Sequence, residues 1–361
     1  MCQGGVRLTP FVIPFFIAHQ GCPHQCVFCN QHAISGAAPG EVGAGQVVRE
    51  IDEKLAWPRR VGRPVQVAFY GGSFTGLPLG RQEELLGAVA PYLATGQVQE
   101  IRISTRPDLI TQAGVGHLKA FGVKLVELGV QSLDDEVLKK SGRGHTASDV
   151  EEAFALLKSR GMQVGGQLMV GLPGDSRRTA LQSARRLAAL GPDLVRLYPT
   201  LVMKGSPLAA SFAQGFFRPW SLGLCTAVCG CMKDIFDRQG IVVARMGLQS
   251  CESLELSMVA GPYHPAFGEL VLSRQYYKMV RATLFAARKD GAERLVTLQL
   301  AERDRSLFVG MKKENLARYQ RRDLLRNVNV VFVPEQPRFT AQVLYMGARR
   351  GRPATIQNQA E

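Results

Sequence analysis

Short apolar runs alternate with helix-length segments through most of this 361-residue chain, and this alternation limits the possible folds more than any other feature. Several runs are almost continuously apolar, which is typical of strands that are covered on both faces. Between two of them, segment 147–160 has apolar residues at helical spacing, preceded by Thr146 and Asp149 in a capping-box pattern. We predict strands at Val12–Ala18, Val65–Tyr70, Glu100–Ser104, Lys124–Val130, Val164–Val170, Asp193–Tyr198 and Ile241–Arg245.

Strand and helix repeated in this way predict an α/β fold with a parallel sheet and right-handed crossovers. An open doubly wound sheet and a full or partial barrel both fit the pattern. In either architecture, ligands bind at the carboxyl ends of the strands. The residues that follow each predicted strand are therefore the first candidates for a functional site.

The character of the sequence changes near residue 250. We expect a core domain at 1–250, a small α+β extension at 251–345, and a basic, disordered tail at 346–361. In the extension we predict helices at Gln275–Arg288 and Lys313–Asn327, and strands at Arg294–Leu300, Leu307–Gly310 and Asn329–Val333.

The charge of the chain favours an anionic partner. The formal net charge is +14 and the sequence pI is about 9.7, which suits RNA, a phosphate ester or a membrane surface. The second helix of the extension carries Arg318, Arg321, Arg322 and Arg326, and a solvated face and an RNA-binding surface are equally good interpretations. No apolar run approaches the roughly 18 residues of a membrane span. We expect no span and a cytoplasmic location.

Three cysteines close to the first predicted strand form the most informative motif. Cys22, Cys26 and Cys29 have the spacing C-x3-C-x2-C. In a long chain without a signal peptide, such a cluster predicts metal ligands rather than disulfides. Three thiolates can hold three corners of a cubane iron–sulfur cluster and leave the fourth iron open. The alternative is a zinc site with His19, His24 or His32 as the fourth ligand.

A second group of cysteines gives a weaker signal. Cys225, Cys229, Cys231 and Cys251 could hold another cluster. On a helix, however, residue 231 points away from residue 229. Buried helix cysteines are the favoured interpretation.

The cysteine motif resembles that of the radical S-adenosylmethionine (SAM) superfamily, C-x3-C-x-aromatic-C, with Phe28 at the aromatic position. The resemblance implies an enzyme with a 4Fe-4S cluster that reductively cleaves SAM, using a donor such as flavodoxin or ferredoxin. It also implies a substrate hydrogen that is abstracted. With it, we expect the fold to be a partial (βα)6-type TIM-like barrel.

The resemblance also implies a SAM pocket. Gly71, Gly72 and Ser73 match the segment that holds the methionine amino group, although many members have Glu where Ser73 stands. Gln131 matches the residue that reaches the ribose, and Arg143 an arginine near the methionine carboxylate. The implied cofactor-binding residues are Phe28, Gly71, Gly72, Ser73, Ser104, Arg106, Gln131, Arg143, Gln167, Val170 and Leu172.

Within the superfamily, residues 10–250 are most similar to the radical domain of the Elongator catalytic subunit. The shared segments include Ser104–Asp108, Glu127–Gln131, Arg143–Thr146 and Tyr198–Val202. That resemblance implies tRNA or another RNA as substrate, but we expect no acetyltransferase domain. The alternatives are a radical enzyme for a small anionic metabolite and a zinc-stabilised RNA-binding protein without catalysis.

Overall fold

The computed structural model describes residues 10–35, 42–289 and 295–345. Two compact units are present, the first formed by residues 1–228 and 235–265 and the second by residues 229–234 and 266–361. This division comes later in the chain than the boundary that we expect at residue 250. The basic tail at 346–361 lies outside the described residues. In the part of the chain that is described, no helix is long and apolar enough to cross a bilayer.

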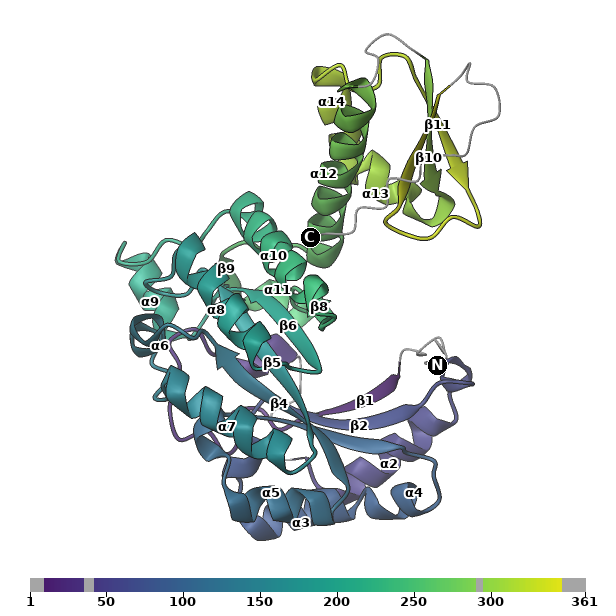
Figure 1. The fold of residues 1–361 in the computed structure, drawn as a ribbon. Helices are drawn as coiled ribbons and strands as arrows, with labels where there is room; N and C mark the ends of the chain where they lie inside the picture. The colour runs from purple at the N-terminus through teal and green to yellow at the C-terminus, as the bar shows by residue number, and fades with distance from the viewer. Residues whose placement is uncertain (1–9, 36–41, 290–294, 346–361) are drawn as a thin grey trace. The chain divides into compact units, whose positions relative to one another are not determined.

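The first unit is built on a parallel sheet of seven strands in the order β1-β2-β3-β4-β5-β6-β8. Spatial order follows chain order, as in a barrel, and does not reverse as it does in a doubly wound sheet. Figure 1 shows the sheet curling into an open half-barrel. The expected partial TIM-like barrel is therefore confirmed. The strands are β1 Phe11–Phe16, β2 Val65–Tyr70, β3 Glu100–Thr105, β4 Val123–Gln131, β5 Gln163–Val170, β6 Leu194–Pro199 and β8 Val242–Met246.

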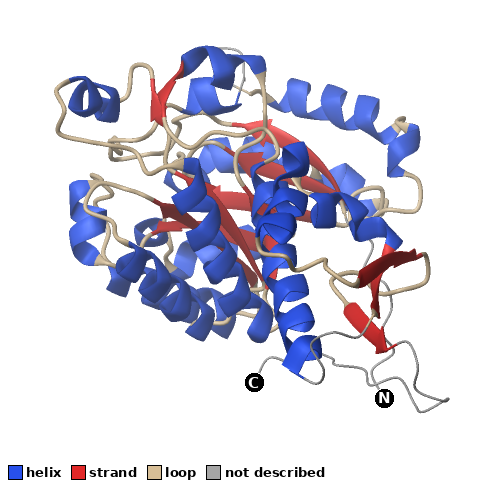
Figure 2. Cartoon of the chain, turned by 90° about the horizontal axis from the view of Figure 1, so that it is seen from above, coloured by secondary structure: helices blue, strands red, loops and turns tan. Residues whose placement is uncertain are grey.

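Helices cover the outer face of this sheet (Figures 1 and 2). All seven strands lie within two residues of their predicted bounds. Helix α7 begins after a capping box of Thr146 and Asp149, and its apolar face buries Val150, Phe154 and Leu157. The helices of this unit are α1 Gln31–Ser35, α2 Ala44–Leu55, α3 Leu79–Gly87, α4 Ala90–Ala94, α5 Gln112–Ala120, α6 Asp135–Lys140, α7 Ala147–Ser159, α8 Arg177–Ala189, α9 Pro207–Ala213 and α11 Glu252–Ser257. Helix α10 Leu222–Arg238 is shared, because its residues 229–234 belong to the second unit. Strands β7 Val202–Met203 and β9 Met258–Ala260 form a separate antiparallel pair.

The second unit has the expected α+β composition. Its sheet has the order β11-β10-β12, with β10 Val296–Ala301, β11 Val328–Val333 and β12 Ala341–Tyr345. Helices α12 Phe267–Lys289, α13 Arg305–Val309 and α14 Glu314–Arg321 accompany the sheet. The core of the unit includes Tyr276, Leu298, Phe308 and Tyr319.

Three predictions for this unit are wrong. Helix α12 begins at Phe267, eight residues before the predicted start at Gln275. Segment 307–310 is not a strand: it belongs to α13 and ends at Gly310 with φ 74°. Four apolar residues are too few to separate the two periodicities, and both Leu307 and Phe308 are buried, as a helix against a core allows. The basic helix ends at Arg321 rather than Asn327, because Asp323 and Asn327 both have positive φ.

Candidate active site

The three motif cysteines lie on the loop that follows β1, at the carboxyl end of the parallel sheet. Cys26 is buried, Cys29 half-buried and Cys22 exposed. The backbone fixes the loop from two sides, because Val27 N–H donates to the Ser141 carbonyl and Leu208 N–H donates to the Val27 carbonyl. The thiol-bearing loop is thus held by backbone groups far along the chain, which presets the positions of the sulfur atoms.

Glycines in the next loop are required because that loop packs directly against the cysteine loop. A Cβ on Gly72 would lie 2.4 Å from the carbonyl oxygen of Gln20, and a Cβ on Gly21 would lie 2.2 Å from that of Ser73. Both distances are far below normal contact. Cys22 Sγ lies 3.3 Å from Ser73 Oγ. The Gly-Gly-Ser segment therefore supports the chain that leads into the first cysteine.

Arg143 brings a positive charge to the thiols. Its Nη1 donates to Cys26 Sγ at 3.2 Å, and its Nη2 donates to the Gly129 carbonyl at 2.5 Å. Its Nε is buried without a hydrogen-bond partner. A neighbouring arginine, Arg106, bonds the Arg143 carbonyl and both carboxylate oxygens of Asp108, while its own Nη1 is buried and unpartnered. Two orphaned guanidinium donors therefore point to an anionic group at this site.

Without a bound cation, Cys29 is a neutral thiol. Burial, reinforced by the proximity of Cys26 and Cys22, raises the pKa of Cys29 to about 12. Such a thiol stays protonated at neutral pH unless a bound cation draws the proton off. Iron ions would supply that charge, and three cysteine thiolates on one loop are a suitable donor set for them.

Gln131 ends β4 in a conformation that a side chain rarely adopts. Its φ is 63°, the strand register shifts just before it, and its side chain is buried. Its Oε1 accepts a hydrogen bond from Gln167 Nε2 at 3.3 Å. Left-handed backbone at a non-glycine residue costs roughly 1–3 kcal/mol and concentrates at functional sites. This backbone conformation places the amide at the same end of the sheet as the cysteines.

A cavity of about 800 Å³ in the first unit brings most of the predicted site residues together. Its lining includes Cys22, Cys26, Cys29, Phe28, Gly71, Gly72, Ser73, Ser104, Arg106, Gln131, Arg143 and Gln167. Two predicted residues do not line it. Leu172 packs in an apolar cluster with Cys26 and Phe28, and Val170 is fully buried in the sheet. A cavity of this size accommodates a ligand as large as a nucleoside derivative.

The inner face of the sheet holds a buried charge network that was not predicted from the sequence. Glu127 on β4 accepts from Arg102 Nε at 2.9 Å and from the Tyr70 hydroxyl at 2.9 Å. Arg196 on β6 lies 2.6 Å from the same carboxylate and donates to the Tyr70 hydroxyl at 2.8 Å. Glu127, Tyr70 and Arg196 also line the cavity, together with Tyr198. The only sequence signal is the presence of charged residues inside otherwise apolar strands.

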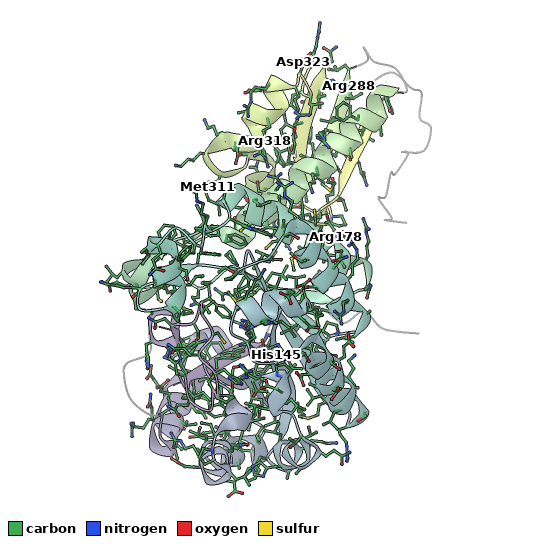
Figure 3. The ribbon with its side chains drawn as sticks, turned by 90° about the vertical axis from the view of Figure 1, so that its left-hand side faces the viewer. His145, Arg178, Arg288, Met311, Arg318 and Asp323 are labelled. Carbon is green, nitrogen blue, oxygen red and sulfur yellow. The ribbon has the colours of Figure 1, made fainter. Side chains whose placement is uncertain are left out.

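His145 lies beneath the site as a neutral imidazole. Its Nε2 lies 3.3 Å from the Val130 carbonyl oxygen, and Figure 3 shows it inside the first unit. Burial, together with the charges of Arg143 and Arg106, lowers its pKa to about 3. It therefore acts as a packing and hydrogen-bonding group rather than as a proton shuttle.

Two of the three candidate histidines contact groups other than the cysteines, and the ring centroid of the third, His32, lies 5.3 Å from that of His19. His19 Nε2 accepts from the Gln31 N–H at 2.9 Å, and the His24 ring packs against Gly144. Among the described residues, no group of three or more His, Cys, Asp or Glu is arranged to hold a single metal ion. Zinc needs its ligands about 2.0–2.3 Å from one centre, whereas a cubane takes one thiolate at each iron. A zinc site and a cubane therefore differ in how many of these thiolates must meet at one metal ion.

The second group of cysteines lies on α10 and at the start of α11. Cys225 and Cys229 are fully buried on α10. Cys251 Sγ lies 3.8 Å from the Ile34 carbonyl oxygen and 3.4 Å from Ser253 Oγ.

Comparison with known proteins agrees with this geometry. Residues 16–187 match the radical SAM superfamily, and residues 192–277 match the Radical_SAM C-terminal domain. The chain therefore belongs to the radical SAM superfamily.

The relatives include proteins named for tRNA. A tRNA uridine(34) acetyltransferase from Dehalococcoides mccartyi (strain CBDB1) is 30% identical over 246 residues, covering 59% of this chain and 54% of the relative. Protein YhcC from Escherichia coli (strain K12) is 28% identical over 195 residues, covering 53% and 60%. This chain thus spans about half the length of the curated relatives that it matches.

One solved structure supports the fold. The archaeal Methanocaldococcus infernus Elp3 with an N-terminal deletion superposes with a TM-score of 0.59 at 23% identity, covering 76% of this chain and 64% of that one.

Proposed function

We propose that this chain is a radical SAM enzyme that binds a 4Fe-4S cluster and SAM and acts on RNA, with tRNA the first candidate. The observation that carries the proposal is the meeting of Cys22, Cys26 and Cys29 with Gln131 and Arg143 at one cavity. When bound, the reduced cluster supplies the electron for reductive cleavage of the SAM sulfonium.

Each side chain has a physical role in the proposal. The three cysteines hold three irons as thiolates. Arg143 offsets negative charge at Cys26, and its guanidinium lines the cavity as a donor group for the carboxylate of SAM. The amides of Gln131 and Gln167 hold each other and present polar edges to the ribose and adenine. The apolar cluster around Phe28 and Leu172 keeps water away from the buried side of the cysteine loop.

The inner face of the sheet offers the substrate side of the cavity. Arg196 and Tyr198 line this part, and the paired carboxylate of Glu127 keeps Arg196 in place. The guanidinium and the phenol can donate hydrogen bonds to carbonyl oxygens of a nucleobase. Because the relative from Dehalococcoides mccartyi is named for uridine 34 of tRNA, a pyrimidine is the base that we propose.

The RNA part of the proposal rests on charge and on relatives. The net charge is +14, and relatives from three organisms carry the name tRNA uridine(34) acetyltransferase. Acetyl transfer is not part of the proposal, since the match covers about half of the first relative. The proposal also includes a reduced one-electron donor, such as flavodoxin or ferredoxin, and a cytoplasmic location.

The test is SAM consumption by the anaerobically reconstituted protein, with and without unmodified tRNA. We expect tRNA to stimulate formation of methionine and a mass change in one nucleoside of the digested tRNA. SAM cleavage that tRNA neither stimulates nor couples to a modified nucleoside would contradict the RNA proposal.

A second candidate, a small anionic metabolite, has its own support. Arg106, Arg143, Arg196 and Arg245 all line the cavity, which is a cationic lining for a small acid. Stimulation of SAM cleavage by a fraction of small metabolites, after nuclease treatment and with no effect of tRNA, would favour it.

A further inference from the structure

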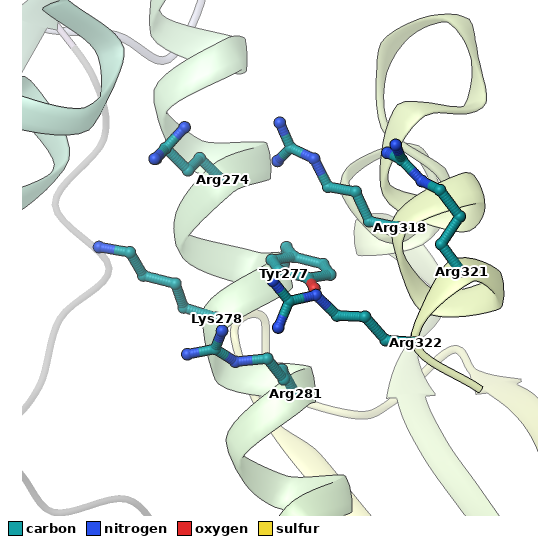
Figure 4. Close-up of a pocket in the computed structure, with 7 residues that line it drawn as sticks. All are labelled: Arg274, Tyr277, Lys278, Arg281, Arg318, Arg321 and Arg322. Carbon is teal, nitrogen blue, oxygen red and sulfur yellow. The ribbon is translucent and has the colours of Figure 1, made fainter. Parts of the chain in front are cut away.

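Six cationic side chains converge on one pocket in the second unit. Arg274, Lys278 and Arg281 come from α12 at helical spacing, and Arg318, Arg321 and Arg322 come from α14 and its end. They line a cavity of about 450 Å³ together with Tyr277. Figure 4 shows Arg318 and Arg322 reaching from α14 toward α12, with Tyr277 between the two helices. The pocket is thus two-sided, which the sequence of the basic helix alone does not indicate.

Little negative charge balances these cations. In the described part of the unit, Arg318 has an ion pair with Glu314, and the structure records none for the other five cations of the pocket. Arg326 is not in the lining; it is paired with Asp323 and is exposed. Like charges gathered in one pocket repel one another, so the arrangement favours an anion that enters between them. Arg274 supports this, because its Nε is buried without a hydrogen-bond partner.

Tyr277 organises the pocket. Its ring is buried, and the guanidinium carbons of Arg318 and Arg281 lie 5.6 Å and 6.0 Å from the ring centroid. Cation–π contacts therefore fix a guanidinium from each helix before any ligand arrives. Five of the six cations are arginines, whose planar fork matches phosphate oxygens better than the ammonium of lysine does. The pocket is built for oxyanions.

We propose that this pocket binds the phosphodiester backbone of the RNA on which the enzyme acts, an inference that rests on the proposed function. Arg274 and Arg281 lie seven residues apart on α12, which is roughly 10 Å along the axis at 1.5 Å per residue. That span exceeds a single phosphate and suits consecutive phosphates of a strand. A membrane surface fits less well, because the lining lacks the apolar side chains that insert into lipid.

Backbone contacts position an RNA without reading its sequence and release counterions on binding. The test variant is Lys278→Gln with Arg321→Gln and Arg322→Gln, three exposed cations drawn from both helices. The matched control is Arg177→Gln with Arg178→Gln and Arg185→Gln, three exposed arginines of α8 in the first unit, one of which is labelled in Figure 3. Both triple variants lower the net charge of +14 by the same three units.

Binding of an unmodified tRNA transcript is measured by fluorescence anisotropy across a salt series. We expect the pocket variant to bind at least about tenfold more weakly at low salt, and the slope of log affinity against log salt to fall by about 2, at roughly 0.7 per lost phosphate contact. The control should stay within about twofold of wild type. Lys278→Arg with Arg321→Lys and Arg322→Lys keeps the charge and should restore most of the binding.

The outcomes separate this inference from the proposed function. If tRNA binding weakens equally in the pocket variant and the control, the assignment of the pocket as the RNA-binding site is overturned, but the RNA proposal stands. No binding by wild type at low salt overturns both. Cluster content and SAM cleavage without RNA should match wild type in all variants, and an altered iron content in the pocket variant alone would show that it acts through folding and overturn the assignment.

Discussion

Arg143 donates a hydrogen bond to Cys26 Sγ at 3.2 Å, although 117 residues separate them in the chain. The same guanidinium bonds the Gly129 carbonyl, so β4, the loop after α6 and the cysteine loop meet at one side chain. The proposed cluster and the SAM pocket therefore share a single cation.

The first prediction concerns this arginine. Arg143→Ala should weaken SAM binding to the reconstituted protein by about 1.5–3 kcal/mol, the usual scale for a hydrogen bond to a charged group. Arg143→Lys keeps the charge but cannot reach both partners, so its affinity should be intermediate. Calorimetric titration measures both. Wild-type affinity in the alanine variant would remove Arg143 from the SAM site.

The second prediction concerns Gly72. In Gly72→Ala the new Cβ would lie 2.4 Å from the Gln20 carbonyl oxygen, so the chain that leads into Cys22 must move. We expect a loss of about 1–3 kcal/mol in the free energy of unfolding, the scale for overpacking, and a lower iron content after reconstitution.

Gly116→Ala is the control for that variant. Gly116 is exposed within α5, and a Cβ there meets no atom within 4 Å. Alanine should therefore stabilise the protein by roughly 0.5–1 kcal/mol without changing the iron content. Equal iron content in both glycine variants would show that the close packing at Gly72 does not position the cysteine loop.

The third prediction concerns Glu127. Glu127→Gln leaves the guanidinium groups of Arg102 and Arg196 without the carboxylate between them. Removing one partner of a buried ion pair costs about 3–5 kcal/mol, and we expect a loss of that size in urea unfolding. If the midpoint and the slope of the urea unfolding curve are both unchanged in the variant, the network is solvated in solution and the prediction is contradicted.

The fourth prediction is a pH dependence. The pKa of His145 falls from its ordinary 6.5 to about 3 on folding, chiefly through burial. Between these values the unfolded chain binds a proton that the folded chain does not, so stability falls as the pH falls from about 6.5 toward 3. His145→Gln removes this contribution, and its stability should fall less steeply, by up to about 1.4 kcal/mol per pH unit. Urea unfolding of both proteins in steps below pH 6.5 is the measurement, and parallel curves would contradict it.

The fold could be predicted where each element carries its own signal. The apolar run of β2 needs no distant partner to be recognised, and the capping box before α7 marks its first turn. Segment 307–310 lacks such a signal, and only the core formed with Tyr319 and the sheet decides that it is helical. β12 pairs with β10 through residues far apart in sequence, and nothing local predicts it.

The site residues divide in the same way, into those with a local sequence signal and those that depend on distant partners. Gly71 and Gln131 could be located because each follows a predicted strand, and parallel strands end at one edge. The network around Glu127 could not, because its partners stand on three other strands and only the register of the sheet aligns them. The place of Arg274 in a pocket could not be predicted for the same reason, because α14 supplies the other side of that pocket.

The central claim is that Cys22, Cys26 and Cys29 are the ligands of a 4Fe-4S cluster, and iron and sulfide analysis after anaerobic reconstitution tests it most directly. Wild type should hold about four irons and four sulfides per chain, with the visible charge-transfer absorption of such a cluster. Replacing any one of the three by Ala should abolish that absorption, whereas Cys225→Ala, a buried helix position, should keep it. Zinc without sulfide in wild type, or a full iron complement in all three alanine variants, would contradict the account.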